Sequence, residues 1–201
     1  MVSLAFALTG GIACGKSMAE RCFRACGCRV LDVDETVRAL EAPGGRAVAP
    51  IVAAFGPGMA TPEGGVDRRA LGALVFADAA ARARLEAIVL PLAREETAAW
   101  RAAARPGEIS VFSAATLFEQ GWDVGWDGIV CVLASRGTQV RRMMAARGMT
   151  RAEAEARLDA QLPAEEKARR ATWTLRNDAD DPAALQAQVE ALVGRWKQRL
   201  V

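Results

Sequence analysis

The sequence predicts an α/β fold, in which a core of about five parallel strands is wrapped by helices. Along most of the 201 residues, apolar strand-like segments alternate with helix-like segments, which is the pattern of a parallel sheet with helical crossovers. The first strand-like segment leads directly into the octapeptide GGIACGKS, Gly10 to Ser17, and a helix-like segment follows. A G-x-x-x-x-G-K-S loop in that context presents backbone N–H groups to phosphate oxygens at the positive end of a helix.

This phosphate loop, residues 10–17, predicts a nucleoside triphosphate site. The backbone amides from Gly11 to Ser17 would surround the β-phosphate, and Lys16 would reach the β- and γ-phosphates. The Ser17 hydroxyl would hold Mg²⁺. The alternative, a glycine-rich turn that binds nothing, is disfavoured by the strand before the loop and the helix after it. The residues expected to contact the nucleotide here are Gly11, Ile12, Ala13, Cys14, Gly15, Lys16, Ser17 and Met18.

The first elements surround this loop. Residues 3–8 are apolar and form the expected first strand, and residues 16–26 form the helix after the loop. Gly27 is expected to end that helix, because glycine adopts the left-handed conformation of a helix C-terminus without strain. The second strand, residues 28–33, runs into the sequence Asp32-Val33-Asp34.

The next section, residues 35–107, contains several helical patterns and no convincing strand. Its Pro- and Gly-rich stretch, residues 55–65, is expected to be a loop. Apolar residues recur at helical spacing from Leu85 to Leu92, which predicts one amphipathic helix over residues 78–104.

The remaining elements complete the sheet. Further strands are expected at residues 108–112, 127–134 and 171–175. Two short helices, residues 139–146 and 150–161, are expected between the last two strands, and Thr150 with Glu153 predicts a capping box for the second. The last helix, residues 182–199, carries one apolar face that is typical of core packing: Leu185, Val189, Leu192, Trp196 and Leu200.

This order predicts a nucleotide-binding core with two helical insertions. The core would comprise residues 1–34, 108–135 and 171–201, the acceptor-binding insertion residues 35–107, and a lid residues 136–170. The lid segment is rich in arginine: Arg136, Arg141, Arg142, Arg147, Arg151, Arg157, Arg169 and Arg170. Such a run is often a solvated helix face, but beside a triphosphate site it also suits a mobile lid that closes positive charge onto phosphates.

Composition restricts the function further. The net charge of +2 argues against a nucleic-acid partner bound by bulk electrostatics. No apolar stretch reaches about 18 residues and the N-terminus is strand-like, so we expect a cytoplasmic protein without a membrane partner. The sequence contains no histidine, which excludes Ser-His-Asp and Cys-His sites and leaves a carboxylate as the general base. The five cysteines are expected to be reduced and mostly buried.

Several segments together resemble one enzyme family. They are Leu8-Thr9-Gly10-Gly11-Ile12, Val30-Leu31-Asp32-Val33-Asp34, Gly65-Val66-Asp67-Arg68-Arg69 with Leu71 and Val75-Phe76, Leu85-Glu86-Ala87-Ile88 before Pro91, and Thr116-Leu117-Phe118-Glu119. Gln139, Arg142, Gln161 and Asn177 also match the family's lid and base segments. This set resembles the dephospho-CoA kinase family, which phosphorylates the ribose 3′-hydroxyl of dephospho-coenzyme A with ATP in the last step of coenzyme A synthesis.

The resemblance implies roles for individual residues. Asp34 would accept the proton of the 3′-hydroxyl, and Lys16 would bridge the β- and γ-phosphates. Arg142 would meet the transferring phosphoryl charge from the lid, and Asn177 would face the adenine of ATP. The acceptor would be contacted by Thr9, Asp34, Arg68, Leu90 and Glu119. The enzyme would need Mg²⁺ and would act as a monomer or small homo-oligomer.

Structural roles stay open for three of these residues. Asp34 also suits the N-cap of a helix that begins at Glu35. Arg68 also suits a surface ion pair with Asp67 or another nearby acid, and Glu119 a purely structural cap.

Some positions depart from the family's pattern. Leu90 stands where the family has a histidine, and a leucine there cannot hydrogen-bond a polar acceptor. Ala13 and Cys14 replace the usual Gly and Ser, and Ala13 fits only with a negative or mildly strained φ. Ser113 stands where many members have Asp. Ala115, Ala146 and Thr172 replace a Pro, an Arg and an Asp, respectively.

These departures leave two other functions open. One is a small-molecule kinase of the nucleoside-monophosphate type. The other is a nucleotide-binding protein that has lost its kinase activity.

Overall fold

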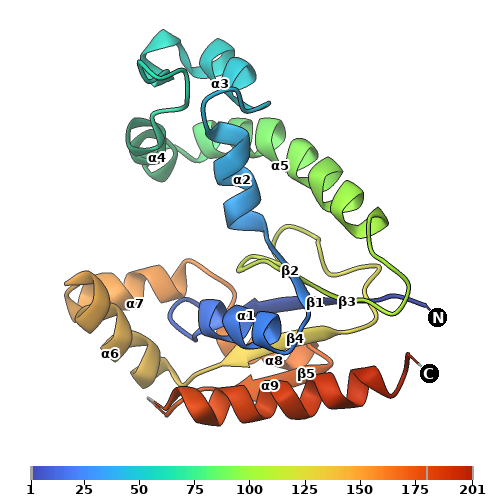
Figure 1. Cartoon of the computed structure of the whole chain (residues 1–201). Coiled ribbons are helices and arrows are strands. Elements are labelled where there is room, and N and C mark those ends of the chain that lie inside the picture. Colours follow the sequence, from blue (N-terminus) through green and yellow to red (C-terminus); the bar gives the residue numbers. More distant parts are fainter. Residues whose placement is uncertain (1, 180, 201) are drawn as a thin grey trace. The chain divides into compact units, whose positions relative to one another are not determined.

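The computed structural model, which describes residues 2–179 and 181–200, contains a five-stranded sheet (Figure 1). Its strands are β1 (Leu4–Gly10), β2 (Arg29–Asp32), β3 (Ile109–Ser113), β4 (Ile129–Leu133) and β5 (Trp173–Arg176), in the order β2-β3-β1-β4-β5. Strand β1 pairs in parallel with β3 and β4, and β4 pairs in parallel with β5. The predicted α/β fold is confirmed.

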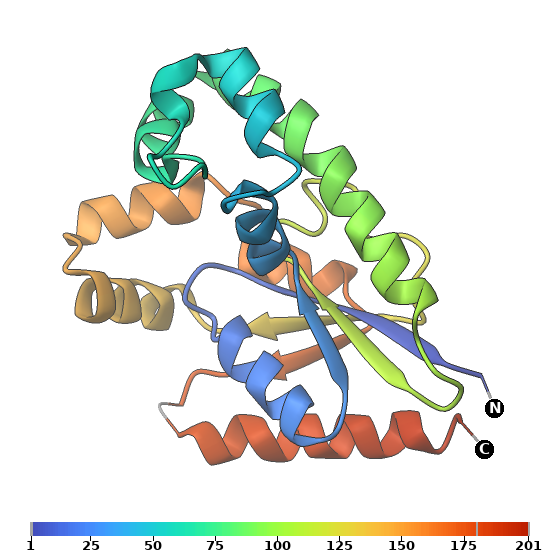
Figure 2. The same ribbon diagram turned by 45° about the horizontal axis from the view of Figure 1, so that its top comes forward.

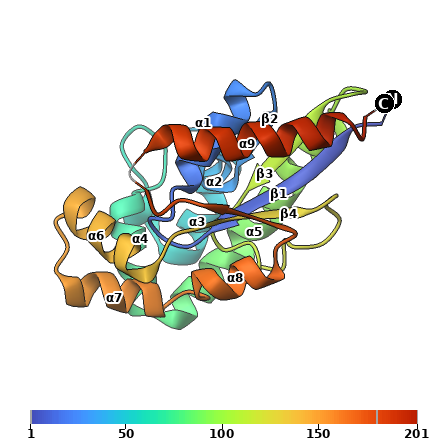
Figure 3. The same cartoon turned by 90° about the horizontal axis from the view of Figure 1, so that it is seen from below.

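The chain divides into two compact units. The first contains the described residues up to Leu31 and from Ala104 onward, and therefore the sheet. Its helices are α1 (Lys16–Ala25), α6 (Arg136–Arg147), α7 (Arg151–Asp159), α8 (Ala164–Arg170) and α9 (Pro182–Lys197). Helices α1 and α9 cover one face of the sheet and α8 lies on the other (Figure 3).

Aromatic stacking organises the core of this unit. The Phe6 ring of β1 stacks on Trp196 of α9 with 3.7 Å between ring centroids, and Phe23 of α1 stacks on the same indole. Each such pair contributes about 0.5–1.5 kcal/mol beyond its burial. Four residues of the apolar face predicted for the last helix are thus buried in this core, whereas Leu200 lies beyond the end of α9 and is partly buried.

The second unit, Asp32–Ala103, is helical. It contains α2 (Val33–Glu41), α3 (Val48–Phe55), the 3₁₀ helix η1 (Pro57–Met59), α4 (Arg68–Ala77) and α5 (Ala79–Ala102). Helices α2, α3 and α4 pack against the long α5, as Figure 2 shows. The predicted amphipathic helix is confirmed as α5, which continues through Pro91.

Most strand and helix ends lie one or two residues from the predicted positions, and three differences have a structural cause. Helix α2 begins two residues early because the Asp32 carboxylate caps it, accepting from the Asp34 N–H. Helix α6 begins at Arg136 because Ser135 caps it. Helix α8, which the sequence did not separate from the lid segment, packs on β4 and β1 and has its own place in the core. The predicted capping box of Thr150 and Glu153 is confirmed.

Among the residues that the structure describes, no helix is both long enough and apolar enough to cross a membrane.

Candidate functional site

The phosphate loop connects β1 to α1 at the carboxyl edge of the sheet. Gly15 has φ +98°, in the left-handed region that suits glycine, and stands at the N-cap of α1. Ser17 lies in the first helical turn with its side chain exposed. The loop thus delivers a helix N-terminus and its dipole to the point where phosphates are expected.

Three side chains hold successive carbonyls of the loop. Gln139 Nε2 donates to the Ile12 carbonyl at 2.7 Å, and Arg142 Nη1 donates to the Ala13 carbonyl at 3.3 Å. Asn177 Nδ2 donates to the Cys14 carbonyl at 2.8 Å. In a planar trans peptide the C=O and the following N–H point in opposite directions, so each bond also orients an amide. The three donors form a carbonyl brace (Gln139, Arg142 and Asn177) that sets the curvature of the loop.

The loop glycines make room for this brace. A Cβ added at Gly11 would lie 2.7 Å from Gln139 Nε2, and one added at Gly15 would lie 2.1 Å from Asn177 Nδ2. Both approaches are closer than side-chain carbons tolerate, so the motif's glycines serve the brace as well as the backbone turn.

Ala13 has a strained backbone conformation within the phosphate loop. Its φ is +59°, the one positive φ of a non-glycine residue in the described chain. The Cβ of an L-residue costs about 1–2 kcal/mol in this conformation. The sequence analysis required either a negative or a mildly strained φ at Ala13, and the structure shows the strained alternative.

Ala13→Gly is expected to stabilise the protein by about 1 kcal/mol, because relief of the steric strain exceeds glycine's extra unfolded-state entropy. A change of that size raises Tm by about 2–4 °C in a chain of this length. Ala187→Gly, at an exposed site inside α9, is the matched control and should lower Tm, since glycine weakens a helix interior. A lower Tm for Ala13→Gly would contradict the strain.

Cys14 adds no charge to the loop. Its side chain is fully buried, and burial raises the pKa of its thiol above the ordinary value. The neutral thiol does not repel a phosphate at neutral pH. Burial raises the pKa of Cys28 and of Cys131 to about 12 as well.

Lys16 lies in a buried polar cluster at the end of β3. Its Nζ donates to Glu20 Oε1 at 2.7 Å and to Ser113 Oγ at 2.9 Å. Ser113 Oγ in turn donates to Glu20 Oε1 at 2.5 Å. Sequence reasoning missed Glu20, although its i,i+4 spacing from Lys16 on a helix was a usable signal.

Thr9 and Glu119 lie around a second buried cation. Lys167 is fully buried, pairs with Glu119 Oε1 at 2.8 Å and donates to the Ala115 carbonyl at 2.6 Å. Thr9 Oγ1 donates to the same carbonyl, and Glu119 accepts the Leu162 N–H. Glu119 thus has a structural role, and its contact with an acceptor stays a prediction.

The second unit holds the other predicted site residues. Asp34 follows the carboxyl end of β2 and lies in the first turn of α2, whose N-cap is Asp32. The interpretation of Asp34 as the cap is therefore wrong, because the helix begins before it. Arg68 Nε pairs with Glu41 Oε2 at 3.0 Å while its side chain stays about half exposed. Burial raises the pKa of the Glu41 carboxyl, and the Arg68 charge opposes that rise.

Leu90 is half-buried on α5, directly before Pro91.

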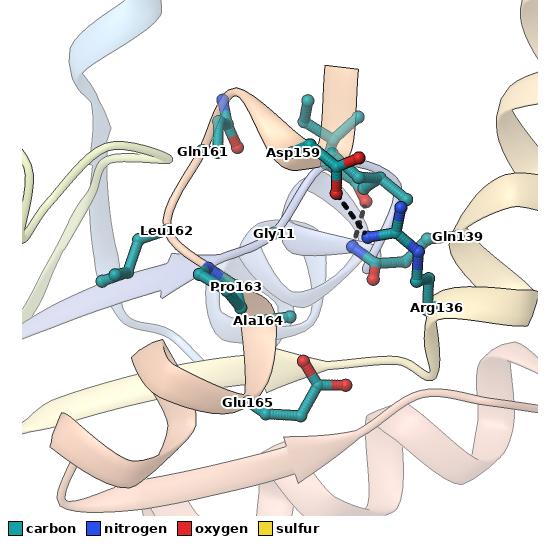
Figure 4. Close-up of a pocket in the computed structure, with 11 residues that line it drawn as sticks. Gly11, Arg136, Gln139, Asp159, Gln161, Leu162, Pro163, Ala164 and Glu165 are labelled. Atoms are coloured by element: carbon teal, nitrogen blue, oxygen red, sulfur yellow. Dashed lines mark hydrogen bonds and ion pairs between the residues drawn. The ribbon is translucent and has the colours of Figure 1, made fainter. Parts of the chain in front are cut away.

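A cavity of about 190 Å³ opens beside the phosphate loop in the first unit. Gln139 points from α6 toward the loop, and Arg136 pairs with Asp159 at 2.9 Å across the cavity's rim (Figure 4). The full lining is Gly11, Ile12, Arg136, Gln139, Leu158, Asp159, Gln161, Leu162, Pro163, Ala164 and Glu165. The loop and the lid segment therefore enclose one common space.

Comparisons with known proteins show the family of this chain. The family model of dephospho-CoA kinase matches residues 4–182. The dephospho-CoA kinase of Geobacter sulfurreducens is 43% identical over 196 residues, which cover 96% of each chain. That of Anaeromyxobacter dehalogenans is 45% identical over 92% of this chain and 89% of its own. The chain belongs to the dephospho-CoA kinase family.

Solved structures support the fold. The crystal structure of TT1252 from Thermus thermophilus is 33% identical and superposes with a TM-score of 0.81, covering 97% of this chain and 98% of its own. Dephospho-CoA kinase from Campylobacter jejuni, at 20% identity and TM-score 0.67, covers 96% and 97% and shows the same fold. Membership of this family makes the chain a kinase, a phosphotransferase, and disfavours the nucleoside-monophosphate type of kinase.

Proposed function

We propose that this protein transfers the γ-phosphoryl group of ATP to the ribose 3′-hydroxyl of dephospho-coenzyme A, the last step of coenzyme A biosynthesis. The observation that best supports this proposal is the phosphate loop. Its carbonyls are held by the carbonyl brace, and its Lys16 lies at the end of β3. A loop with its amides preset costs little reorganisation when charge develops on the phosphates, which is the main demand of phosphoryl transfer.

The nucleotide would be bound by the loop. Amides from Gly11 to Ser17 surround the β-phosphate, Lys16 bridges the β- and γ-phosphates, and Asn177 lies near the base while bracing Cys14. Arg142, which bonds the Ala13 carbonyl, would also meet the charge of the transferring group. Ile12 and Met18 complete the contact set.

The chemistry of the loop fits a magnesium ion. Ser17 offers an exposed hydroxyl oxygen in the first turn of α1, and Mg²⁺ prefers such hard oxygen ligands together with substrate phosphates. The bound ion would neutralise charge on the β- and γ-phosphates.

The acceptor would be held by the residues that the family resemblance implies. Asp34 would take the proton of the attacking 3′-hydroxyl, since a carboxylate is the available base in a chain without histidine. Arg68, Leu90, Thr9 and Glu119 would contact the rest of the acceptor. In this proposal residues 35–107 form the acceptor-binding insertion and residues 136–170 the lid.

The remaining assignments follow from the substrates and composition. Both substrates are small anionic molecules, and the net charge of +2 argues against a nucleic-acid partner bound by bulk electrostatics. We propose a cytoplasmic enzyme that acts as a monomer or small homo-oligomer.

The direct test is a coupled assay with ATP and Mg²⁺, run with dephospho-coenzyme A and, separately, with AMP, CMP and pantothenate. Turnover with dephospho-coenzyme A alone supports the proposal. Turnover with a nucleoside monophosphate instead would indicate another small-molecule kinase. ATP binding without turnover of any acceptor would indicate an inactive nucleotide-binding protein.

Leu90→His is expected to lower KM for dephospho-coenzyme A and to leave KM for ATP unchanged, because it restores a polar contact worth about 1–3 kcal/mol. Saturation curves for both substrates measure the effect. Leu92→His, another half-buried leucine of α5, is the matched control and should not change the acceptor KM. A fall in Tm without a gain in acceptor affinity would show that Leu90 belongs to a dry, repacked surface.

A further inference from the structure

Glu20 is a buried carboxylate next to the phosphate loop. It lies on the second turn of α1 with its side chain 5% exposed, and its Oε1 accepts from both Lys16 Nζ and Ser113 Oγ. An ionised carboxylate loses several kcal/mol of hydration when it is buried, so it persists only with a close counter-charge and hydrogen bonds. Lys16 and Ser113 supply both.

The position of Ser113 shows where else a carboxylate could reach Lys16. Ser113 is the last residue of β3 and pairs in register with Leu8 of β1, just before the phosphate loop. The Ser113 Oγ lies 2.9 Å from Lys16 Nζ, so an aspartate at that position would place its carboxylate within ion-pair distance of the same ammonium group.

We infer that Glu20 is a positioning residue for Lys16, and that a carboxylate at position 113, at the end of β3, could take its place. Glu20 holds the Lys16 ammonium group beside Ser113 at the end of β3, and Ser113 keeps the Glu20 carboxylate in place. Moving the carboxylate from position 20 to position 113 would preserve one carboxylate for one lysine, with the carboxylate on a different element. The kinetic part of the test rests on the proposed kinase function, but the binding and stability parts do not.

The test moves the carboxylate from position 20 to position 113. Glu20→Gln keeps the size of the side chain but removes the charge that competes with phosphate for Lys16, so MgATP should bind about threefold or more tightly. Without its partner Lys16 is less well placed, so kcat should fall by about tenfold. Ser113→Asp adds a second carboxylate, which should weaken MgATP binding and lower Tm. The double variant Glu20→Gln/Ser113→Asp should return the Kd for MgATP, kcat and Tm to near the parent values.

Calorimetry with MgATP and melting curves test the role of Glu20 even if the parent protein has no turnover. If the proposed kinase function is wrong, the parent protein itself will be inactive in the assay. Glu190→Gln, an exposed carboxylate of α9, controls for the change in net charge and should leave Kd unchanged. Unchanged MgATP affinity in Glu20→Gln would show a merely structural role and overturn the inference. A double variant whose loss of Tm is the sum of the two single losses would overturn it too. Should Glu20→Gln not fold, a folded, parent-like double variant supports the inference, and an unfolded one overturns it.

Discussion

Lys16→Ala is expected to lower kcat by about 100-fold or more, because no other cation of the phosphate loop replaces its charge on the transferring phosphoryl group. The structure adds a second expected effect. The Lys16–Glu20 pair is buried, so loss of the lysine leaves a carboxylate without its counter-charge and lowers Tm. The measurements are kcat with saturating substrates and a melting curve.

A companion variant separates these two effects. Lys16→Ala/Glu20→Gln removes the unpaired charge, so it should recover much of the lost Tm while activity stays low. Lys197→Ala, an exposed lysine of α9, should change neither. Retention of more than about a tenth of the parent kcat in Lys16→Ala would correspond to less than about 1.4 kcal/mol of lost transition-state stabilisation and would place the phosphate site elsewhere.

Asp34→Asn is expected to lower kcat by about 10²-fold or more while the Kd for ATP stays close to that of the parent, because it removes the base and leaves the phosphate loop intact. Stability should change little. The N-cap of α2 is Asp32, so the substitution leaves the cap in place, and the interaction of Asp34 with the helix dipole is worth about 0.3–1 kcal/mol.

The control for this prediction is a true cap. Asp78 caps α5 by accepting from the Ala80 N–H, and Asp78→Ala should cost about 1 kcal/mol of stability without a change in kcat. If Asp34→Asn behaved like that control, with reduced Tm and normal kcat, Asp34 would not be the base.

Local sequence patterns were enough to predict the strands, most helices and the phosphate loop. The motif from Gly10 to Ser17 carries its own backbone chemistry, and the capping box at Thr150 needs only a residue three positions later. Such features depend on spacing along the chain, which is why they can be recognised before any packing is known.

Boundaries were less predictable where two residues offer the same local chemistry. Asp32 and Asp34 are both good helix caps, and the end of β2 decides between them. Helix α8 has only 7 residues and is stabilised by its contact with the sheet rather than by propensity.

The sequence by itself determined the fold class, the phosphate loop and the candidate roles of Lys16, Ser17 and Asp34. Only the tertiary structure decided how these groups are held. Asn177 reaches the Cys14 carbonyl across 163 positions and Gln139 reaches the Ile12 carbonyl across 127. A parallel sheet brings the carboxyl ends of strands that are distant in sequence to one edge, so the partners that brace a loop there follow from strand order and packing.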